Sequence, residues 1–106
     1  MNVSLKYQAI GSGDIDVTDA FATDGPILKY NLKILKDDKG FFPPYYAAPI
    51  IRKDTLEAHP ELEEVLNMLE GRIDDAKMTE LNYKVDIENQ PVEKVAEEFL
   101  KAEGLL

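Results

Sequence analysis

The sequence predicts an α/β fold with a short β-rich first part and a helical, acidic second part. Alternating apolar and polar residues dominate two stretches of the first part, residues 15–22 and 32–38, and such alternation is typical of strands. Beyond residue 53, apolar residues recur at three- and four-residue steps among charged ones, as in amphipathic helices. The length of 106 residues suits one domain with one modest hydrophobic core.

The chain begins with a helix signal and then a strand signal. Apolar residues that run into a Gly-Ser-Gly sequence predict a short helix over residues 3–10. Residues 15–22 alternate, and the alternation places Ile15, Val17 and Phe21 on one face of a strand. We therefore expect Phe21 to lie near the end of the first strand.

A second helix and a second strand are predicted next. Thr-Asp-Gly-Pro at residues 23–26 indicates a helix start, because Thr or Asp can cap free amide groups and proline is tolerated in a first turn. A short helix should follow over residues 26–31. The strand at residues 32–38 ends in a polar turn, and the prolines beyond it exclude a fully paired central strand in the next segment.

Three amphipathic helices are predicted in the second part. The first extends to Gly71 and has Pro60 near its start. Acidic residues from Asp74 onward can cap the second, and Pro91 opens the third. The apolar residues that define their faces are Leu56, Leu62, Val65, Leu66 and Leu69; Met78, Leu81, Tyr83 and Val85; and Val92, Val95, Phe99 and Leu100.

The composition excludes several classes of function. A formal charge of −9 opposes binding to nucleic acid or to an anionic membrane surface. The absence of cysteine removes disulfides, thiol catalysis and thiolate metal sites, and a single histidine, His59, makes a zinc site or a histidine-based triad improbable. No apolar run approaches the roughly 20 residues of a membrane span, and the first residues lack a signal-peptide profile.

The acidic residues do not form a pattern of catalysis or metal binding. Four aspartates at positions 14–24 resemble a calcium loop, but the sequence lacks the glycine and the closing glutamate that such a loop needs. Most glutamates fall on the predicted helices, where a solvated face explains them. Arg52 is compatible with either a buried ion pair or a solvent-exposed position. We therefore expect no metal, no cofactor and no enzymatic activity.

The stretch FFPPYYAAP at residues 41–49 holds four of the nine aromatic residues of the chain. Neighbouring side chains of an extended segment point to opposite sides, so Tyr45 and Tyr46 cannot both line one pocket. From physical chemistry alone, packing in a core is favoured over ligand contact by about two to one. Both roles stay open for this stretch.

Four runs of residues resemble a known family. DVTDAFATDGPI, LKILKDDKGFFPPYYAAPIIRKDTL, ELEEVLNMLEGRI and LNYKVDIENQPVEKVAEEFLKAEGLL are similar, in unbroken order, to the C-terminal portion of the substrate-binding proteins of osmoprotectant ABC importers. Those proteins bind quaternary ammonium compounds such as glycine betaine, choline and carnitine. Complete members are longer, so the resemblance implies roughly the last third to two-fifths of one.

The resemblance implies a fragment of a type II periplasmic-binding-protein fold, in which two α/β lobes close over a ligand. Residues 1–42 would belong to the second lobe, and residues 43–106 would form the crossing strand and the C-terminal helices of the first lobe. It also implies an extracytoplasmic component that works with an ABC permease and is held at the membrane by a lipid anchor or a permease fusion. This chain carries no targeting signal for that location.

The family encloses the trimethylammonium group in a cage of aromatic rings, which attract the cation through their π faces. Two of these rings map to Phe21, in a D-A-aromatic-x-T-D motif, and to Tyr45, in a P-P-Y-Y motif. Phe21 replaces the usual tyrosine and lacks its hydroxyl group. Thr23 and Asp24 either favour a ligand carboxylate through free amides or act as a plain helix cap. We expect Tyr45 to face a concave surface and Tyr46 to be buried.

One alternative stays open, and one consequence follows from a fragment. The alternative is a free-standing small α/β protein whose aromatic stretch is a protein–protein interface. If the chain is a fragment, most of its ligand site is missing, and its strand edges and apolar helix faces are uncovered. Such edges recruit second chains, so a homo-oligomer is expected.

Overall fold

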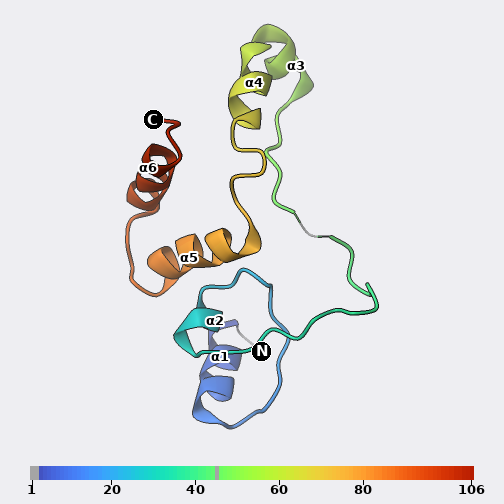
Figure 1. Cartoon of the computed structure of the whole chain (residues 1–106), viewed down its shortest axis with the longest axis vertical. Helices are drawn as coiled ribbons and strands as arrows, with labels where there is room; N and C mark the ends of the chain where they lie inside the picture. The colour runs from blue at the N-terminus through green and yellow to red at the C-terminus, as the bar shows by residue number, and fades with distance from the viewer. Residues whose placement is uncertain (1–2, 45) are drawn as a thin grey trace. The chain divides into compact units, whose positions relative to one another are not determined.

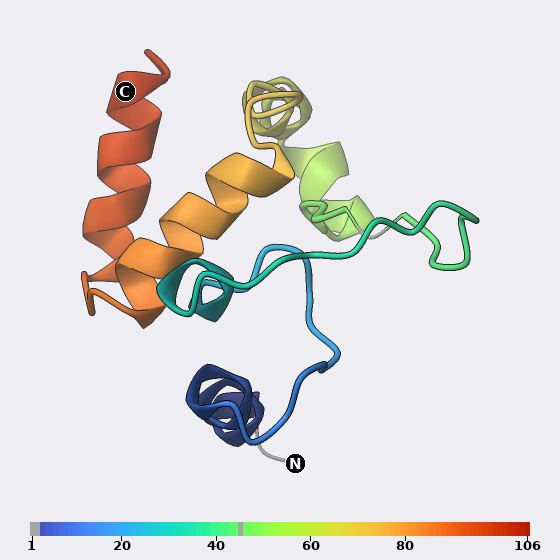
Figure 2. The ribbon, with the colours of Figure 1, turned by 60° about the horizontal axis from the view of Figure 1, so that its bottom comes forward.

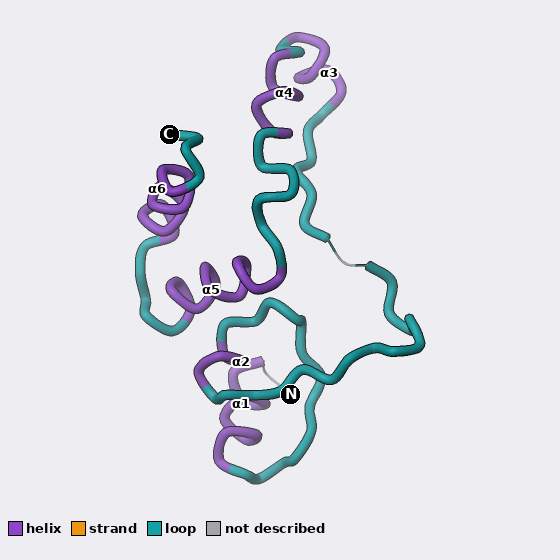
Figure 3. The backbone as a smooth tube through the Cα atoms, in the orientation of Figure 1, coloured by secondary structure: helices purple, strands orange, loops and turns teal. Residues whose placement is uncertain are grey.

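The computed structural model describes residues 3–44 and 46–106, which contain six helices and no strand (Figures 1 and 3). These residues fall into two compact units: unit 1 is Met1–Ile34 with Asp74–Leu106, and unit 2 is Leu35–Ile73. None of the helices in the described ranges is long and apolar enough to cross a membrane. The helices are α1 (Val3–Ser12), α2 (Pro26–Lys29), α3 (Lys53–Ala58), α4 (Glu61–Asn67), α5 (Asp75–Asp86) and α6 (Val92–Ala102).

The two strands predicted at residues 15–22 and 32–38 are not formed in the described part of the chain (Figure 3). The predicted β-rich first part is therefore not found. A strand exists only through hydrogen bonds to a neighbouring strand, and the described residues supply no such neighbour. Most of the large apolar residues of both segments are accordingly exposed, including Val17 and Leu35, whereas Ile15 and Leu32 are half-buried. The alternation of apolar and polar residues shows that these segments are suited to one face of a sheet. It does not show whether a sheet is present.

Unit 1 has a small core to which helices from both ends of the chain contribute. Helix α2 packs against α5, and α5 packs against α6 (Figure 2). The buried apolar side chains come from three helices: Tyr7 on α1, Ile27 on α2, and Val95 and Phe99 on α6. The predicted apolar face of α6 is confirmed at Val95 and Phe99, whereas Val92, in the first turn, is 60% exposed.

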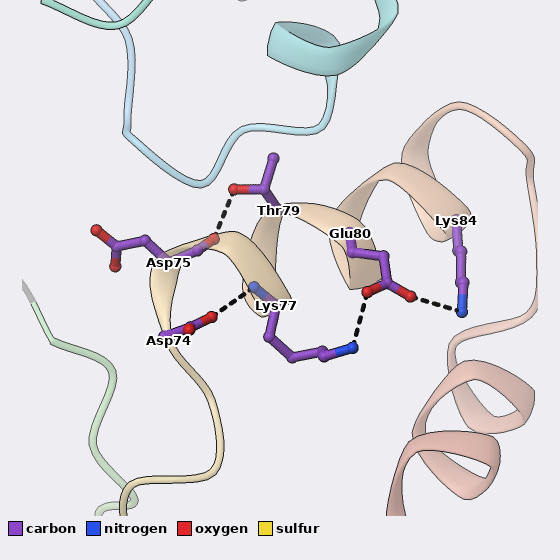
Figure 4. Close-up of polar contacts among 6 residues, drawn as sticks. All are labelled: Asp74, Asp75, Lys77, Thr79, Glu80 and Lys84. Carbon is purple, nitrogen blue, oxygen red and sulfur yellow. Dashed lines mark hydrogen bonds and ion pairs between the residues drawn. The ribbon is translucent and has the colours of Figure 1, made fainter. Parts of the chain in front are cut away.

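Helix α5 starts where the sequence predicts a cap. The Asp74 carboxylate accepts a hydrogen bond of 2.7 Å from the backbone N–H of Lys77, which satisfies one free amide of the first turn (Figure 4). Further along, Glu80 pairs with Lys77 at 2.8 Å and with Lys84 at 3.1 Å. These pairs are partly exposed, so their contribution to stability is small and the cap is the stronger signal.

In unit 2 the helix predicted to extend to Gly71 is divided into α3 and α4, which pack against each other. The division falls at His59, whose φ of −136° and ψ of 68° are not helical. The ring of Pro60 crowds the residue before it and disfavours the helical conformation there. Pro60 thus starts α4, as predicted, and by the same geometry ends α3.

Tyr7 joins α1 to the rest of unit 1. Its side chain is 2% exposed, and its hydroxyl donates a hydrogen bond of 2.5 Å to the carboxylate of Asp24. Burial of the phenol, together with this hydrogen bond and the charge of Asp24, raises the pKa of Tyr7 above its ordinary value. The folded chain therefore favours the neutral phenol.

We expect Phe99→Ala to lower the free energy of unfolding by about 3 kcal/mol, because it removes a buried ring between α5 and α6 and leaves a cavity. Urea unfolding followed by circular dichroism measures this loss. Val92→Ala in the exposed first turn of α6 is the matched control and should change the free energy by less than about 0.5 kcal/mol. Equal effects of the two substitutions would contradict the core described for unit 1.

The raised pKa of Tyr7 predicts a pH dependence of stability. Below about pH 10 the phenol is neutral in both states and its contribution is complete, whereas above that pH the unfolded chain loses the proton first. The free energy of unfolding should therefore fall more steeply above about pH 10 in the original chain than in Tyr7→Phe, by up to about 1.4 kcal/mol per pH unit. Urea titrations between pH 8 and 12 measure the difference, and Asp24→Asn should reduce it. A constant difference across that range would contradict the prediction.

Candidate ligand-binding site

The candidate ring Phe21 lies in the DAFATD motif (residues 19–24), which forms a loop between α1 and α2. The loop closes on itself, because the N–H of Phe21 donates to the Asp24 carboxylate at 3.3 Å and the N–H of Asp24 donates to the Phe21 carbonyl at 3.1 Å. The side chain of Phe21 is 64% exposed. An exposed ring on a closed loop can present its face to a cation.

The two aspartates of the DAFATD motif are both bound by α1. Lys6 forms an ion pair of 3.0 Å with Asp19. The hydroxyl group of the adjacent Tyr7 donates a hydrogen bond to the Asp24 carboxylate. The ammonium group of Lys6 lowers the pKa of Asp19. The ends of the motif are thus attached to two consecutive residues of one helix, although the Asp19 pair is exposed and weaker.

The predicted helix cap at Thr23 or Asp24 is wrong. Helix α2 begins at Pro26, and its N-cap residue is Gly25, which makes no side-chain cap hydrogen bond. The Asp24 carboxylate is engaged instead by the buried phenol of Tyr7, which needs an acceptor because an unpaired buried hydroxyl is costly. A helix of four residues also sums few peptide dipoles, so it attracts a ligand carboxylate only weakly.

Helix α5 holds the backbone of the same loop. The amide of Asn82 donates to the Thr23 carbonyl at 2.8 Å. The buried hydroxyl of Thr79 lies 3.4 Å from the Ala22 carbonyl and 2.7 Å from the Asp75 carbonyl (Figure 4). One hydroxyl proton cannot fully serve both acceptors, so the shorter bond within α5 takes precedence. Asn82 is therefore the main polar link between α5 and the loop.

Gly25 allows this close approach. A Cβ atom at position 25 would lie 3.1 Å from backbone atoms of Asn82 and Tyr83, which is tighter than ordinary carbon contacts. Gly25 is buried, and its backbone φ of −56° would suit any residue, so space and not backbone conformation explains a glycine here. The loop thus rests directly on the backbone of α5.

The second candidate ring, Tyr45, lies outside the described residues, so its pairing with Phe21 stays a prediction. The predicted burial of Tyr46 is wrong, because its side chain is 84% exposed. Proline-rich backbone on both sides keeps this segment out of a sheet, and no described element covers it.

The preceding residues, Phe41 and Phe42, are also exposed, although packing was favoured for them. Their ring centroids are 5.0 Å apart in an edge-to-face arrangement. Asp37 orders their backbone, since its carboxylate accepts hydrogen bonds from the N–H groups of Phe41 at 3.0 Å and Phe42 at 2.8 Å. These two bonds lower the pKa of Asp37. The aromatic stretch is therefore locally ordered at its start without being packed in a core.

A hollow of about 440 Å³ lies in unit 1 beside α1, α2 and the end of α5. Its lining includes Tyr7, Asp24, Lys29 and Tyr30, but not Phe21. The described residues thus do not gather the candidate ligand-binding residues into one cavity. They also contain no group of three or more histidine, aspartate or glutamate residues that could hold a metal ion.

Sequence reasoning missed Tyr7, Asn82 and Gly25 as parts of this site. Asn82 contacts a residue 59 positions away, and Tyr7 contacts one 17 positions away, so no local pattern could have indicated either contact. The only local sign was the DAFATD motif itself.

Comparison with known proteins extends this picture. The sequence profile of the family described as "Substrate binding domain of ABC-type glycine betaine transport system" matches residues 1–102. A carnitine transport binding protein of Listeria monocytogenes is 44% identical over 95% of this chain, which spans 33% of that protein. A glycine-betaine-binding protein of Pseudomonas aeruginosa is 41% identical over the whole chain, which spans 34% of it.

One further relative and one solved structure are also similar to this chain. A protein of Helicobacter pylori named as an ergothioneine transport permease and ergothioneine binding protein is 41% identical over 99% of this chain, which spans 19% of it. Among solved structures, that of a glycine betaine/carnitine/choline ABC transporter superposes with a TM-score of 0.88 and 43% identity, over 99% of this chain and 38% of that one. The chain thus spans from about a fifth to about two-fifths of these proteins, and it belongs to the family of substrate-binding domains of ABC-type glycine betaine transport systems.

Proposed function

We propose that this chain is the C-terminal part of an extracytoplasmic substrate-binding component of an ABC importer for quaternary ammonium osmoprotectants. The match of the family profile to residues 1–102 carries the proposal. The relatives of this chain are several times longer than it is, which supports its assignment as a part of such a protein. The compounds in the names of these relatives, glycine betaine, carnitine and ergothioneine, share a trimethylammonium group. That cation is the ligand feature we assign to the complete protein.

Phe21 and Tyr45 are the two rings that this chain would contribute to an aromatic cage. A trimethylammonium group donates no conventional hydrogen bond, and it is attracted to ring faces. The exposed ring of Phe21, on a loop held at both ends, fits such a role. Thr23 and Asp24 lie beside it, and the engagement of Asp24 by Tyr7 favours support of the loop over direct contact with ligand.

For the complete protein, the assignment of residues 1–42 to the second lobe and of residues 43–106 to the crossing strand and the helices of the first lobe stays a prediction. The packing of α5 against α2 within unit 1 instead favours a single lobe for residues 1–34 and 74–106. The segments at 15–22 and 32–38 would then pair with strands from the rest of the protein. An ABC permease is the proposed partner, and a lipid anchor or a permease fusion is the proposed attachment to the membrane. The alternative of a free-standing protein with an aromatic interface is not favoured, because the similarity runs through the whole chain.

We expect residues 1–106 alone to bind glycine betaine or choline no better than millimolar. Each exposed cation–π contact is worth about 0.5–1 kcal/mol, and two such contacts cannot offset the several kcal/mol lost on immobilising a ligand. The protein expressed with its upstream lobe should bind far more tightly, and Phe21→Ala should weaken that binding about 30-fold if a desolvated contact worth about 2 kcal/mol is lost.

Isothermal titration calorimetry measures both parts of this prediction. Phe21→Tyr is the matched control, since it keeps an aromatic face and should retain most of the affinity. Micromolar binding by the isolated chain would contradict the missing-site argument. Unchanged binding by Phe21→Ala in the longer protein would remove Phe21 from the site.

The isolated chain should also associate with itself. Large apolar side chains such as Phe41, Ile50 and Val17 are exposed, and unpaired extended segments recruit second chains. Light scattering over a range of concentrations should show dimers or larger assemblies. A monodisperse monomer at high concentration would be inconsistent with this proposal.

A further inference from the structure

We infer that Asn82 on α5 is a positioning residue for Phe21, the proposed ligand-binding ring. A helix near the end of the chain would thus influence how tightly a loop near its beginning helps to bind the ligand. This inference rests on the proposed function. Asn82 does not belong to the DAFATD motif, and it donates a hydrogen bond of 2.8 Å to the motif's backbone at the carbonyl of Thr23.

The DAFATD loop has few constraints of its own. It is followed by a helix of only four residues, and its internal hydrogen bonds join Phe21 to Asp24. Its position therefore depends on what it rests against. On the α1 side, the hydroxyl of Tyr7 holds the same Asp24 carboxylate that accepts the N–H of Phe21. Through Asp24, the backbone of Phe21 is thus linked to the buried side chain of Tyr7.

Helix α5 supplies a second support for the loop, separate from that of α1. Asn82 holds the Thr23 carbonyl, and Gly25 lies so close to the α5 backbone that a Cβ atom would meet it at 3.1 Å. On one side, α1 holds the loop through the Lys6 ion pair and the Tyr7 hydrogen bond. On the other side, α5 holds it through the Asn82 hydrogen bond and a backbone contact. Loss of the Asn82 bond releases the carbonyl two residues after Phe21.

Release of the loop would weaken ligand binding through the ring of Phe21. A cation–π contact depends on where the cation lies relative to the ring face, and a ring that must be ordered on binding gives less net affinity than one already in place. Loss of one neutral hydrogen bond that orders the loop should weaken binding about fivefold to tenfold. Asn82 would act on the ligand only through Phe21.

The test is a double-mutant cycle in the longer protein that includes the upstream lobe. Asn82→Asp keeps the shape of the side chain and replaces its N–H donors by a carboxylate that repels the Thr23 carbonyl. The dissociation constants for glycine betaine, choline and carnitine are measured by calorimetry for the original protein, Phe21→Ala, Asn82→Asp and the double variant. Each measurement is made well below the melting temperature of the variant. Asn82→Ser, which shortens the side chain, replaces Asn82→Asp if that variant does not fold.

A matched control on the same helix is Glu80→Gln. Glu80 pairs with Lys77 and Lys84 on the side of α5 away from Thr79 (Figure 4), so its substitution perturbs α5 without touching the loop. We expect Glu80→Gln to change the dissociation constant by less than about twofold, even where it lowers the melting temperature. This control separates positioning of the ring from general destabilisation of α5.

The expected result is that Asn82→Asp weakens binding about fivefold to tenfold alone and less than about twofold when Phe21 is already alanine. Equal effects in both backgrounds, or no effect alone, would overturn the inference while leaving the proposed function intact. An unchanged affinity in Phe21→Ala would instead remove the ring from the site, and the positioning role with it. If the original protein bound none of the three compounds, both the proposed function and this inference would be overturned.

Discussion

Unit 1 depends on the contact between the DAFATD loop and α5. The Asn82 hydrogen bond and the close approach of Gly25 join the first third of the chain to its last third. Without that contact, α1 and α2 would be short helices with little to pack against, and isolated helices of their length are marginal in water. The core residues of α2 and α6 lie on either side of α5, so the same helix also organises the apolar packing.

The buried polar side chains that contact this loop are all paired. Tyr7 and Thr79 are buried polar residues, and each has a hydrogen-bond acceptor. Among the described residues no buried side-chain nitrogen or oxygen lacks a partner. An unpaired group would cost about 1–3 kcal/mol, a large fraction of the stability of a small domain. The loop is therefore held from two sides, by side chains of α1 and by Asn82 of α5.

The extended segments behave differently from unit 1. Residues 15–22, residues 32–38 and the aromatic stretch carry apolar side chains that the described residues leave exposed. Their composition fits the surface of a sheet. The region that matches this chain makes up about a third of two relatives, and the additional residues of those proteins can cover the corresponding side chains. These exposed apolar side chains are the reason why we expect the isolated chain to associate with itself.

The sequence by itself determined the starts of α4, α5 and α6 and the family to which the chain belongs. Asp74, Pro60 and Pro91 mark helix starts because caps and prolines act on the nearest turn of backbone, so their effect is readable locally. Phe21 was identified from its motif for the same reason. Only the tertiary structure decided the rest: strands need partners from elsewhere, the burial of Tyr46 depended on elements that do not cover it, and the supports of the loop come from residues up to 59 positions away. Contacts between distant residues leave no local periodicity, and the physical demand they satisfy, pairing a backbone carbonyl or a phenol, can be met by many side chains at many positions.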